Sequence, residues 1–350
     1  MKMRTLLKCL ASGVLLGCYC VASVAAEHAR TTAQIATYQG ADRQTLLIDG
    51  AKKEGELSVY YSHPIVQVMA DAFTQKYGVK VKLWRGGSEA VMQRIMAESR
   101  AGKHDVDVFL GPSADTEAAY REKLVQEVRS PHLQDLMAGA VPAHRNWAAF
   151  NLDIFTAAYN TKLVKKEDLP KTYDDLTDPK WKGRLAVEAN DHVWLGALLA
   201  ELGEERGRKL FENVIATNGI SVRKGHSLLA GMVASGEVPL ALTVYSWNPE
   251  QLKRKGAPIE AHFLNPMFGV SSAVAIMNKA PHPNAAVLFY DFVLNEGQKL
   301  MADADYVPTN KKVDSKMRSV PFKLVDANRV LDSQDKWFKM YDEIVIKKAR

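Results

Sequence analysis

Cysteine is nearly absent from this 350-residue chain, and its three cysteines, Cys9, Cys18 and Cys20, all lie among the first 20 residues. Beyond that point the chain can form no disulfide bond and no thiolate metal site, and it offers no thiol nucleophile. Hydrophobic residues make up 47% of the sequence, so a packed core has to stabilise the fold instead of covalent cross-links. The length predicts two domains or one large domain.

Long hydrophobic runs are confined to the N-terminus. The apolar run from Leu10 to Val24 follows a short basic segment and ends at Val24-Ala25-Ala26, which is typical of a secretory signal peptide at residues 1–26. No other run approaches the roughly 18 apolar residues of a membrane-spanning helix, so we expect an exported protein in the periplasm. An alternative is lipoprotein processing at Leu15-Leu16-Gly17-Cys18, which would leave Cys18 acylated at the membrane face.

A strong charge of either sign is also missing. The net charge is +6, but the leader holds three basic and no acidic residues, so the remainder carries only +3. That excess is too small to attract a phosphate backbone, and we expect no nucleic-acid partner. The sequence contains no Gly-x-Ser-x-Gly elbow, no His-Glu-x-x-His and no phosphate-binding loop, so we expect neither an enzyme nor a cofactor.

The first half of the chain alternates between strand and helix patterns. Strands are predicted at 57–61, 79–84 and 105–110, separated by helices at 65–77 and 88–102. Helical crossovers of this length require a parallel sheet with right-handed connections, which gives an α/β fold. In such sheets the ligand lies beyond the carboxyl ends of the strands.

Polar residues follow each of these three strands. The residues concerned are Ser62, His63, Arg85, Gly87, Ser88 and Ser113. A glycine-rich helix start presents free backbone N–H groups and a positive dipole end, and Arg85 beside it would add a bidentate contact, so this edge is a candidate anion site. The alternatives are an ordinary Ser88 helix cap, a solvated Arg85, and a surface His63 that caps the next helix.

A second α/β region follows an extended stretch at 148–160. Strands are predicted at 185–187, 220–222, 239–245, 259–264 and 270–277, and helices at 194–202, 227–235, 284–302 and 333–344. By the same strand-end argument, we expect a second set of side chains to face the ligand: Asp191, His192, Lys224, Tyr245, Ser246 and Trp247. Tyr60, Tyr61 and Trp194 are either further aromatic wall residues or core residues.

A series of short segments, in a fixed order, carries a family resemblance. The segments are 57–62, 86–88, 159–163, 175–183, 235–239, 255–258, 280–286 and 295–298. Together they resemble the extracellular solute-binding proteins of bacterial ABC importers, type II fold, in the iron(III)-binding subgroup. The resemblance covers nearly all of residues 56–313. It implies two α/β lobes joined by hinge strands, which close on a ligand and deliver it to an inner-membrane permease.

The resemblance also implies which residues hold the ligand. Iron-binding relatives hold ferric iron with paired tyrosines in the second lobe, assisted by a histidine or tyrosine after the first strand. Tyr245 matches one of those tyrosines and His63 the histidine position, whereas Ser246 stands in place of the second tyrosine and no acidic residue occurs in 111–113. Ferric iron would therefore need an additional anion or water to fill its coordination sphere.

Several functions remain open from the sequence. The ligand is ferric iron, with or without a synergistic anion, or a small anionic solute. Alternatives are an organic cation such as a polyamine or thiamine, bound by cation–π contacts, and a ligand-sensing subunit that serves a membrane receptor. We expect a monomer in which 27–150 and about 265–315 form lobe 1, 151–264 form lobe 2, and helices in 316–350 pack on the lobes.

Overall fold

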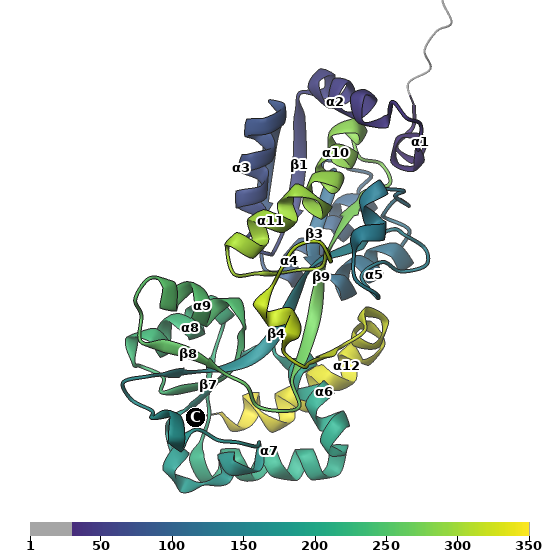
Figure 1. Ribbon diagram of the computed structural model, residues 1–350. Coiled ribbons are helices and arrows are strands. Elements are labelled where there is room, and N and C mark those ends of the chain that lie inside the picture. Colours follow the sequence, from purple (N-terminus) through teal and green to yellow (C-terminus); the bar gives the residue numbers. More distant parts are fainter. Residues whose placement is uncertain (1–29, 350) are drawn as a thin grey trace, which may run out of the picture. The chain divides into compact units, whose positions relative to one another are not determined.

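The computed structural model describes residues 30–349. The predicted leader at residues 1–26 and the alternative lipid site at Cys18 lie outside these described residues. The described chain has two large hydrophobic cores, which correspond to the upper and lower groups of elements in Figure 1. Over residues 30–349, no helix combines the length and the apolar character that a membrane crossing requires.

Three parallel strands form the centre of the first core, in the order β2-β1-β3. They are β1 (Glu56–Tyr61), β2 (Lys80–Arg85) and β3 (Val108–Pro112). The helices around them are α1 (Thr32–Thr37), α2 (Arg43–Glu54), α3 (Val66–Tyr77), α4 (Ser88–Arg100), α5 (Ser113–Arg121), α10 (Pro283–Leu294) and α11 (Glu296–Asp303). Helix α3 ends at Gly78, whose φ of 72° is a left-handed conformation that glycine adopts without steric cost. The predicted order of strands and helices is confirmed here.

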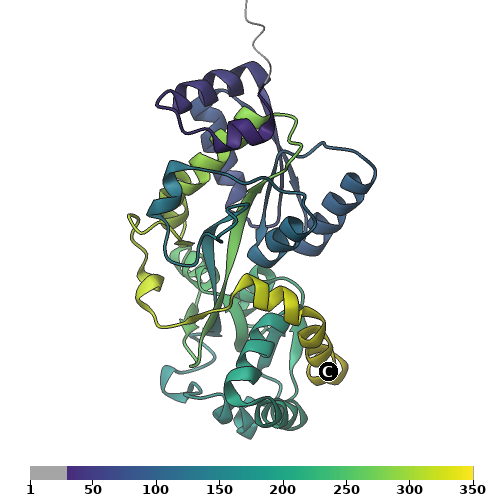
Figure 2. The same ribbon diagram turned by 90° about the vertical axis from the view of Figure 1, so that its right-hand side faces the viewer.

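A second set of parallel strands forms the centre of the second core, in the order β7-β5-β6. They are β5 (Leu185–Glu188), β6 (Ser221–Arg223) and β7 (Leu240–Tyr245). The helices around them are α6 (His192–Leu202), α7 (Glu204–Asn218), α8 (His226–Ser235), α9 (Trp247–Arg254) and α12 (Ala327–Ile344). Figure 2 shows α12, in yellow, beside the helices of the second core, where its Trp337 and Tyr341 are buried.

Two long antiparallel strands connect the cores. The first part of β4 (Ala148–Asn160) pairs with β9 (Phe268–Ile276), and its last part pairs with β7 and with β8 (Ile259–His262). Strand β9 also pairs with β3, so the two parallel sets belong to one mixed sheet. All 13 residues of β4 are buried, which explains its nearly continuous apolar sequence.

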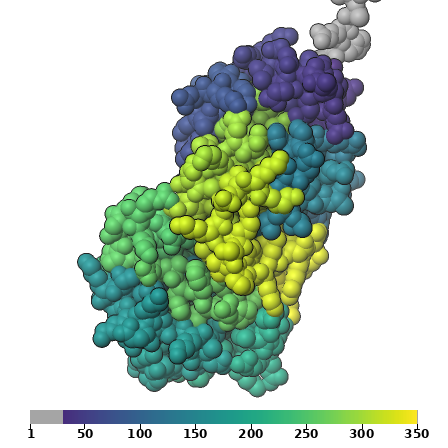
Figure 3. Space-filling model, in the orientation of Figure 1, coloured from purple at the N-terminus to yellow at the C-terminus, as the bar shows by residue number. Residues whose placement is uncertain are grey.

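The segment between α11 and α12 covers the two connecting strands. Its short strands β10 (Val307–Pro308) and β11 (Lys323–Leu324) pair with β4 and β9 respectively. Figure 3 shows this C-terminal part of the chain, in yellow, across the middle of one face. Val307 of this segment packs against Leu152, Ile154 and Met267, which lie beneath it. The connecting strands are thus shielded from solvent on this face.

The structure differs from the sequence-based expectation in several elements. The two extended runs expected in 148–160 form a single strand, and the helix expected at 284–302 is two helices that meet at Asn295, where φ is −114° and ψ is −90°. Helix α7 was not expected, although Leu210, Phe211, Val214 and Ile215 give it a buried stripe at helical spacing. Its charged first turn hides that stripe from a search for apolar runs.

Candidate functional site

The strand ends of the first core lie side by side. The Gly86 N–H donates to the Tyr61 carbonyl at 3.1 Å, and the Ser62 N–H donates to the Leu110 carbonyl at 3.1 Å. Helix α4 begins directly after β2, with Gly87 as its N-cap residue and no side chain bonded to its first turn. Free N–H groups at a helix start suit an oxyanion, so this edge of the sheet retains the chemistry expected of it.

Asp153 on β4 is the centre of a buried polar cluster between the two cores. Its carboxylate lies 3.3 Å from His63 Nε2 and accepts hydrogen bonds from Ser272 Oγ at 2.7 Å and from Trp247 Nε1 at 3.3 Å. Asn151 Nδ2 donates to the same carboxylate at 2.9 Å. Burial by itself would raise the pKa of Asp153, but the charge of His63 and these hydrogen bonds hold the pKa below its usual value. Asp153 is therefore a buried, negatively charged side chain that holds His63 and Trp247 in place.

The strand ends of the second core bring two carboxylates and an imidazole together. Single ligand atoms of Glu188, Asp191 and His226 all lie within 4.8 Å of one another. His226 Nε2 is 2.8 Å from Asp191 Oδ1, while the Glu188 carboxylate accepts hydrogen bonds from the backbone N–H groups of Gly225 and Asn190. Burial and the neighbouring Asp191 raise the pKa of Glu188. Burial by itself lowers the pKa of His226, but the two carboxylates outweigh it and raise that pKa.

Tyr245, the last residue of β7, borders this group. Its ring stacks on His226, with centroids 4.0 Å apart and planes inclined by 25°, and lies 5.3 Å from the ring of Phe155 on β4. Burial is the main reason that the pKa of Tyr245 is raised well above 10, and the carboxylates of Asp153, Asp191 and Glu188 raise it further. The phenol is therefore neutral and lies in a negative potential.

Trp247 links the two cores at the start of α9. Its ring lies 4.8 Å from Tyr306, 6.1 Å from His63 and 6.1 Å from Tyr245 by ring centroids. Tyr306 and His63 belong to segments around the first core, whereas Tyr245 ends a strand of the second. The strand ends of both cores are therefore in contact through aromatic rings in this structure.

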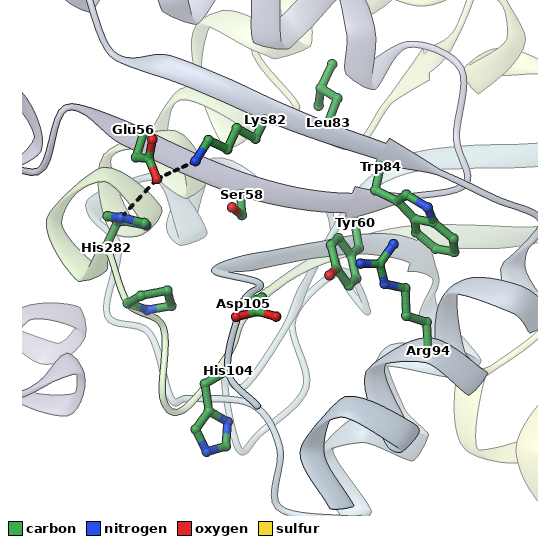
Figure 4. A pocket seen from close by; sticks show the side chains of 11 residues that line it. Glu56, Ser58, Tyr60, Lys82, Leu83, Trp84, Arg94, His104, Asp105 and His282 are labelled. Atoms are coloured by element: carbon green, nitrogen blue, oxygen red, sulfur yellow. Dashed lines mark hydrogen bonds and ion pairs between the residues drawn. The ribbon is translucent and has the colours of Figure 1, made fainter. Parts of the chain in front are cut away.

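A separate cavity of about 470 Å³ lies on the first core, over β1 and β2 and beside α4 (Figure 4). The guanidinium of Arg94 stacks on the rings of Tyr60 and Trp84, at 4.4 and 4.5 Å from their centroids, and Glu56 pairs with Lys82 and His282 on the other side. This cavity is not lined by the polar strand ends. Most of its charged groups already have partners, since Arg94 also pairs with Glu98.

The comparison with protein families decides what kind of site this is. Residues 68–323 match the bacterial extracellular solute-binding proteins. The chain belongs to this family. Its members bind solutes and are not enzymes. The prediction of the family from the sequence is confirmed.

Individual relatives of this solute-binding protein extend the comparison. Iron uptake protein A1 of Synechocystis sp. is 28% identical over 272 residues, which are 69% of this chain and 74% of the relative. The structure of AfuA from Actinobacillus pleuropneumoniae, solved with fructose-6-phosphate, matches with a TM-score of 0.73 at 24% identity, over 84% of this chain and 99% of AfuA. Iron-bound HitA from Pseudomonas aeruginosa matches with a TM-score of 0.71 at 21% identity, over 83% and 99% respectively.

These matches confirm the expected two-lobed type II fold of periplasmic binding proteins. The chain is accordingly the substrate-binding component of an ABC importer, which takes up a small ligand outside the cytoplasm and works with an inner-membrane permease. We call the strand ends of the first core the lobe 1 edge and those of the second core the lobe 2 edge.

The residues expected at the site occupy different positions along these edges. Buried positions are held by His63, Ser113, Asp191, Ser246 and Trp247, half-buried positions by Ser62, Ser88, His192 and Tyr245, and exposed positions by Arg85, Gly87 and Lys224. Ser113 Oγ is bonded to Ser271 Oγ on β9 at 2.7 Å, and His192 stacks on Phe338 of α12 with ring centroids 3.7 Å apart. Ser246 Oγ is buried without a hydrogen-bond partner in the described chain.

The sequence-based readings of several residues need correction. His63 is 6% exposed and belongs to the Asp153 cluster, so it is not a surface residue. Ser88 is the first residue of α4 and not its cap. Among the possible aromatic wall residues, Tyr61 and Trp194 lie in the cores and Tyr60 borders the separate cavity.

Several residues at the site were not expected from the sequence, among them Asp153, Glu188 and Tyr306. Asp153 is the one charged residue within the apolar run 148–160, and Glu188 ends a strand that was predicted to stop at 187. Both anomalies were visible as charges inside or directly after apolar strands. Tyr306 has no such signal, because it reaches the site through a long-range fold contact from the segment before β10.

Proposed function

We propose that this solute-binding protein captures ferric iron together with a small oxyanion between its two lobes. The observation that carries the proposal is the position of Tyr245: its phenol lies in the combined field of Asp153, Asp191 and Glu188. A phenolate is a hard oxygen donor, and a trivalent cation offsets the negative field that keeps the phenol protonated. The iron-binding relatives support this choice of metal.

The oxyanion would occupy the lobe 1 edge. The uncapped first turn of α4 offers N–H donors, and Arg85 at the end of β2 adds an exposed positive charge. Ser246 occupies the position at which a second phenolate would donate to iron, so an added anion would complete the coordination sphere. Opposite charges on the two edges thus suit a ligand with a cationic and an anionic part.

We place the lobe boundaries after residues 150 and 264, with 27–150 and about 265–315 in lobe 1, 151–264 in lobe 2 and 316–350 packed on the lobes. The Trp247 contact with Tyr306 is then an interlobe contact that favours the closed form. We further propose a monomer that is exported to the periplasm by its leader and has no nucleic-acid partner, since its net charge is mild.

The test is a titration of the iron-free protein with ferric citrate, followed by visible absorption. Phenolate coordination of ferric iron produces a charge-transfer band, and Tyr245→Phe is expected to abolish it. The matched control is Tyr159→Phe, which removes a phenol at the far end of β4 that bonds to Glu260. A wild-type protein that stays colourless and binds no iron by elemental analysis would refute the proposal.

A small phosphorylated solute is the second candidate. Ser246 provides no phenolate, and the raised pKa of Tyr245 keeps its phenol protonated, so the two phenolates that hold iron in the relatives are not both present. The anionic head of such a solute would occupy the same lobe 1 edge. Calorimetry with fructose-6-phosphate tests it directly, and Arg85→Ala is expected to weaken binding by about 1.5–3 kcal/mol, the usual range for a charged hydrogen bond. Unchanged affinity in that variant would remove Arg85 from the site.

A further inference from the structure

We infer that Asp191 and His226 bind the metal ion alongside Tyr245, and that Glu188 positions them. The inference rests on the proposed function and names donors for the part of the coordination sphere that Tyr245 cannot fill alone. The sequence predicted that Asp191 faces the ligand, but it could not show that Asp191 meets Glu188 and His226, because these residues lie at the ends of different strands and meet only in the fold. The geometry assigns this set to the lobe 2 edge.

Asp191 offers the group a buried carboxylate oxygen that has no hydrogen-bond partner among the described residues. Its side chain is 3% exposed, and while Oδ1 lies 2.8 Å from His226, Oδ2 is buried without a hydrogen-bond partner in the described residues. A buried carboxylate oxygen without a partner loses its hydration and gains nothing in return. A cation bound at Oδ2 would satisfy that oxygen.

His226 places an imidazole between Asp191 and Tyr245. Its ring stacks on the phenol with centroids 4.0 Å apart, and one of its ring nitrogens lies within 4.8 Å of ligand atoms on both carboxylates. Imidazole, carboxylate and phenolate together form a donor set suited to a hard or borderline metal ion. The two carboxylates also leave an excess negative charge, which a cation would balance.

Glu188 has a different task from its neighbours. It is 2% exposed, and its two carboxylate oxygens accept hydrogen bonds from the backbone N–H groups of Asn190 and Gly225. Its own N–H donates to Thr243 Oγ1 on β7 at 3.1 Å. These bonds hold together the turns that carry Asp191 and His226, so Glu188 is a positioning residue and not a ligand.

The alternative is that Asp191 and His226 form only a structural ion pair. The chain offers a matched control for that alternative in the first core, where Asp107, fully buried, lies 2.9 Å from His282 Nδ1. Among the described residues no tyrosine ring stacks on His282, and the pair lies beside Glu56 at the start of β1, away from the polar strand ends. Substitutions in the two pairs each remove one carboxylate–imidazole contact. Comparing them therefore distinguishes a loss of ligand binding from a loss of packing.

The experiment compares Asp191→Asn and His226→Gln with His282→Gln in the full chain, using ferric citrate as the probe. We expect the first two variants to lower the affinity for iron by at least about 10- to 100-fold, the range for weakened metal coordination. His282→Gln is expected to keep the affinity within about twofold, whatever its melting temperature, as for sites far apart. X-ray absorption at the iron edge is expected to show imidazole scattering in the wild type that His226→Gln removes.

The outcomes distinguish the two proposals. If the wild type shows the charge-transfer band but Asp191→Asn and His226→Gln bind iron unchanged, the inference is overturned while the proposed function stands. If the wild type binds no iron, both the proposed function and the assignment of the metal ligands are refuted. If Asp191→Asn weakens only the binding of fructose-6-phosphate, the group recognises hydroxyl groups and the metal assignment is overturned.

Discussion

The indole of Trp247 packs against the phenol ring of Tyr306, with centroids 4.8 Å apart and planes inclined by 47°. Trp247 starts α9 on the second lobe, and Tyr306 precedes β10 in the segment that follows the first-lobe helix α11. An aromatic pair of this kind contributes about 0.5–1.5 kcal/mol beyond the area it buries. The contact therefore stabilises the arrangement in which the strand ends of the two cores lie together.

Trp247→Ala is expected to shift the ligand-free protein toward an open form. The variant loses the Tyr306 contact and the hydrogen bond to Asp153, and it should increase the radius of gyration measured by small-angle X-ray scattering. Trp84→Ala removes an indole on the outer strand β2 and serves as the control. Identical scattering from Trp247→Ala and the wild type would show that this ring does not hold the lobes together.

Arg43 and Asp291 give a prediction for stability. Arg43 on α2 forms a bidentate ion pair with Asp291 on α10, and both side chains are buried. Arg43→Ala leaves an unpaired buried carboxylate, which is expected to cost about 3–5 kcal/mol in the free energy of unfolding. The double variant Arg43→Ala/Asp291→Ala removes that charge and is expected to recover part of the loss in urea unfolding. A double variant less stable than Arg43→Ala would contradict the account.

Much of the fold could be predicted from the sequence because local patterns decide it. The strands β1, β2 and β3 and the helices between them show alternation, glycine stops and amphipathic spacing within a few residues of one another. The mixed character of the sheet could not be predicted in the same way. It depends on β4 and β9, whose pairing joins residues more than 100 positions apart in the chain.

The site was less predictable than the fold. The strand-end argument predicted ligand-facing residues at the ends of both sets of strands, among them Asp191, Tyr245 and Trp247. It could not show that Tyr245 stacks on His226 or that Trp247 reaches Asp153, since these contacts depend on side-chain directions and on lobe closure. For His192 the strand-end argument predicted the position but not the contact. It follows β5 as expected, but its ring stacks on Phe338 of α12.

Gly196 allows a test of the packing between α6 and α12. A Cβ atom at this position would lie 2.4 Å from the indole ring of Trp337, which is buried. Gly196→Ala is therefore expected to lower the free energy of unfolding by about 1–3 kcal/mol through overpacking. Gly231→Ala in α8 is the control, since nothing lies within 4 Å of its added Cβ and alanine favours a helix by about 1 kcal/mol. Equal effects of the two substitutions in thermal unfolding would rule out the steric explanation.

Asp115 in the first turn of α5 makes stability depend on pH. Burial raises the pKa of its carboxyl from 3.8 to about 7, and its Oδ2 has no hydrogen-bond partner in the described chain. At a pH between 3.8 and about 7, the Asp115 carboxyl is protonated in the folded state but ionised in the unfolded state. Asp115 therefore lowers the free energy of unfolding progressively as the pH rises from about 4 to 7, and the full cost is present above that range.

Asp115→Asn removes this cost because the amide does not ionise. The variant is expected to be more stable than the wild type by about 2 kcal/mol at pH 8 and nearly equal to it at pH 4, since each pKa unit corresponds to about 1.4 kcal/mol and partial hydration reduces the effect. Asp49→Asn, at an exposed position on α2, is the control and should change little at either pH. Urea unfolding at both pH values measures the difference. A stability gain of the same size at pH 4 and pH 8 would mean that the effect comes from packing, because only a titrating carboxyl makes the gain grow with pH.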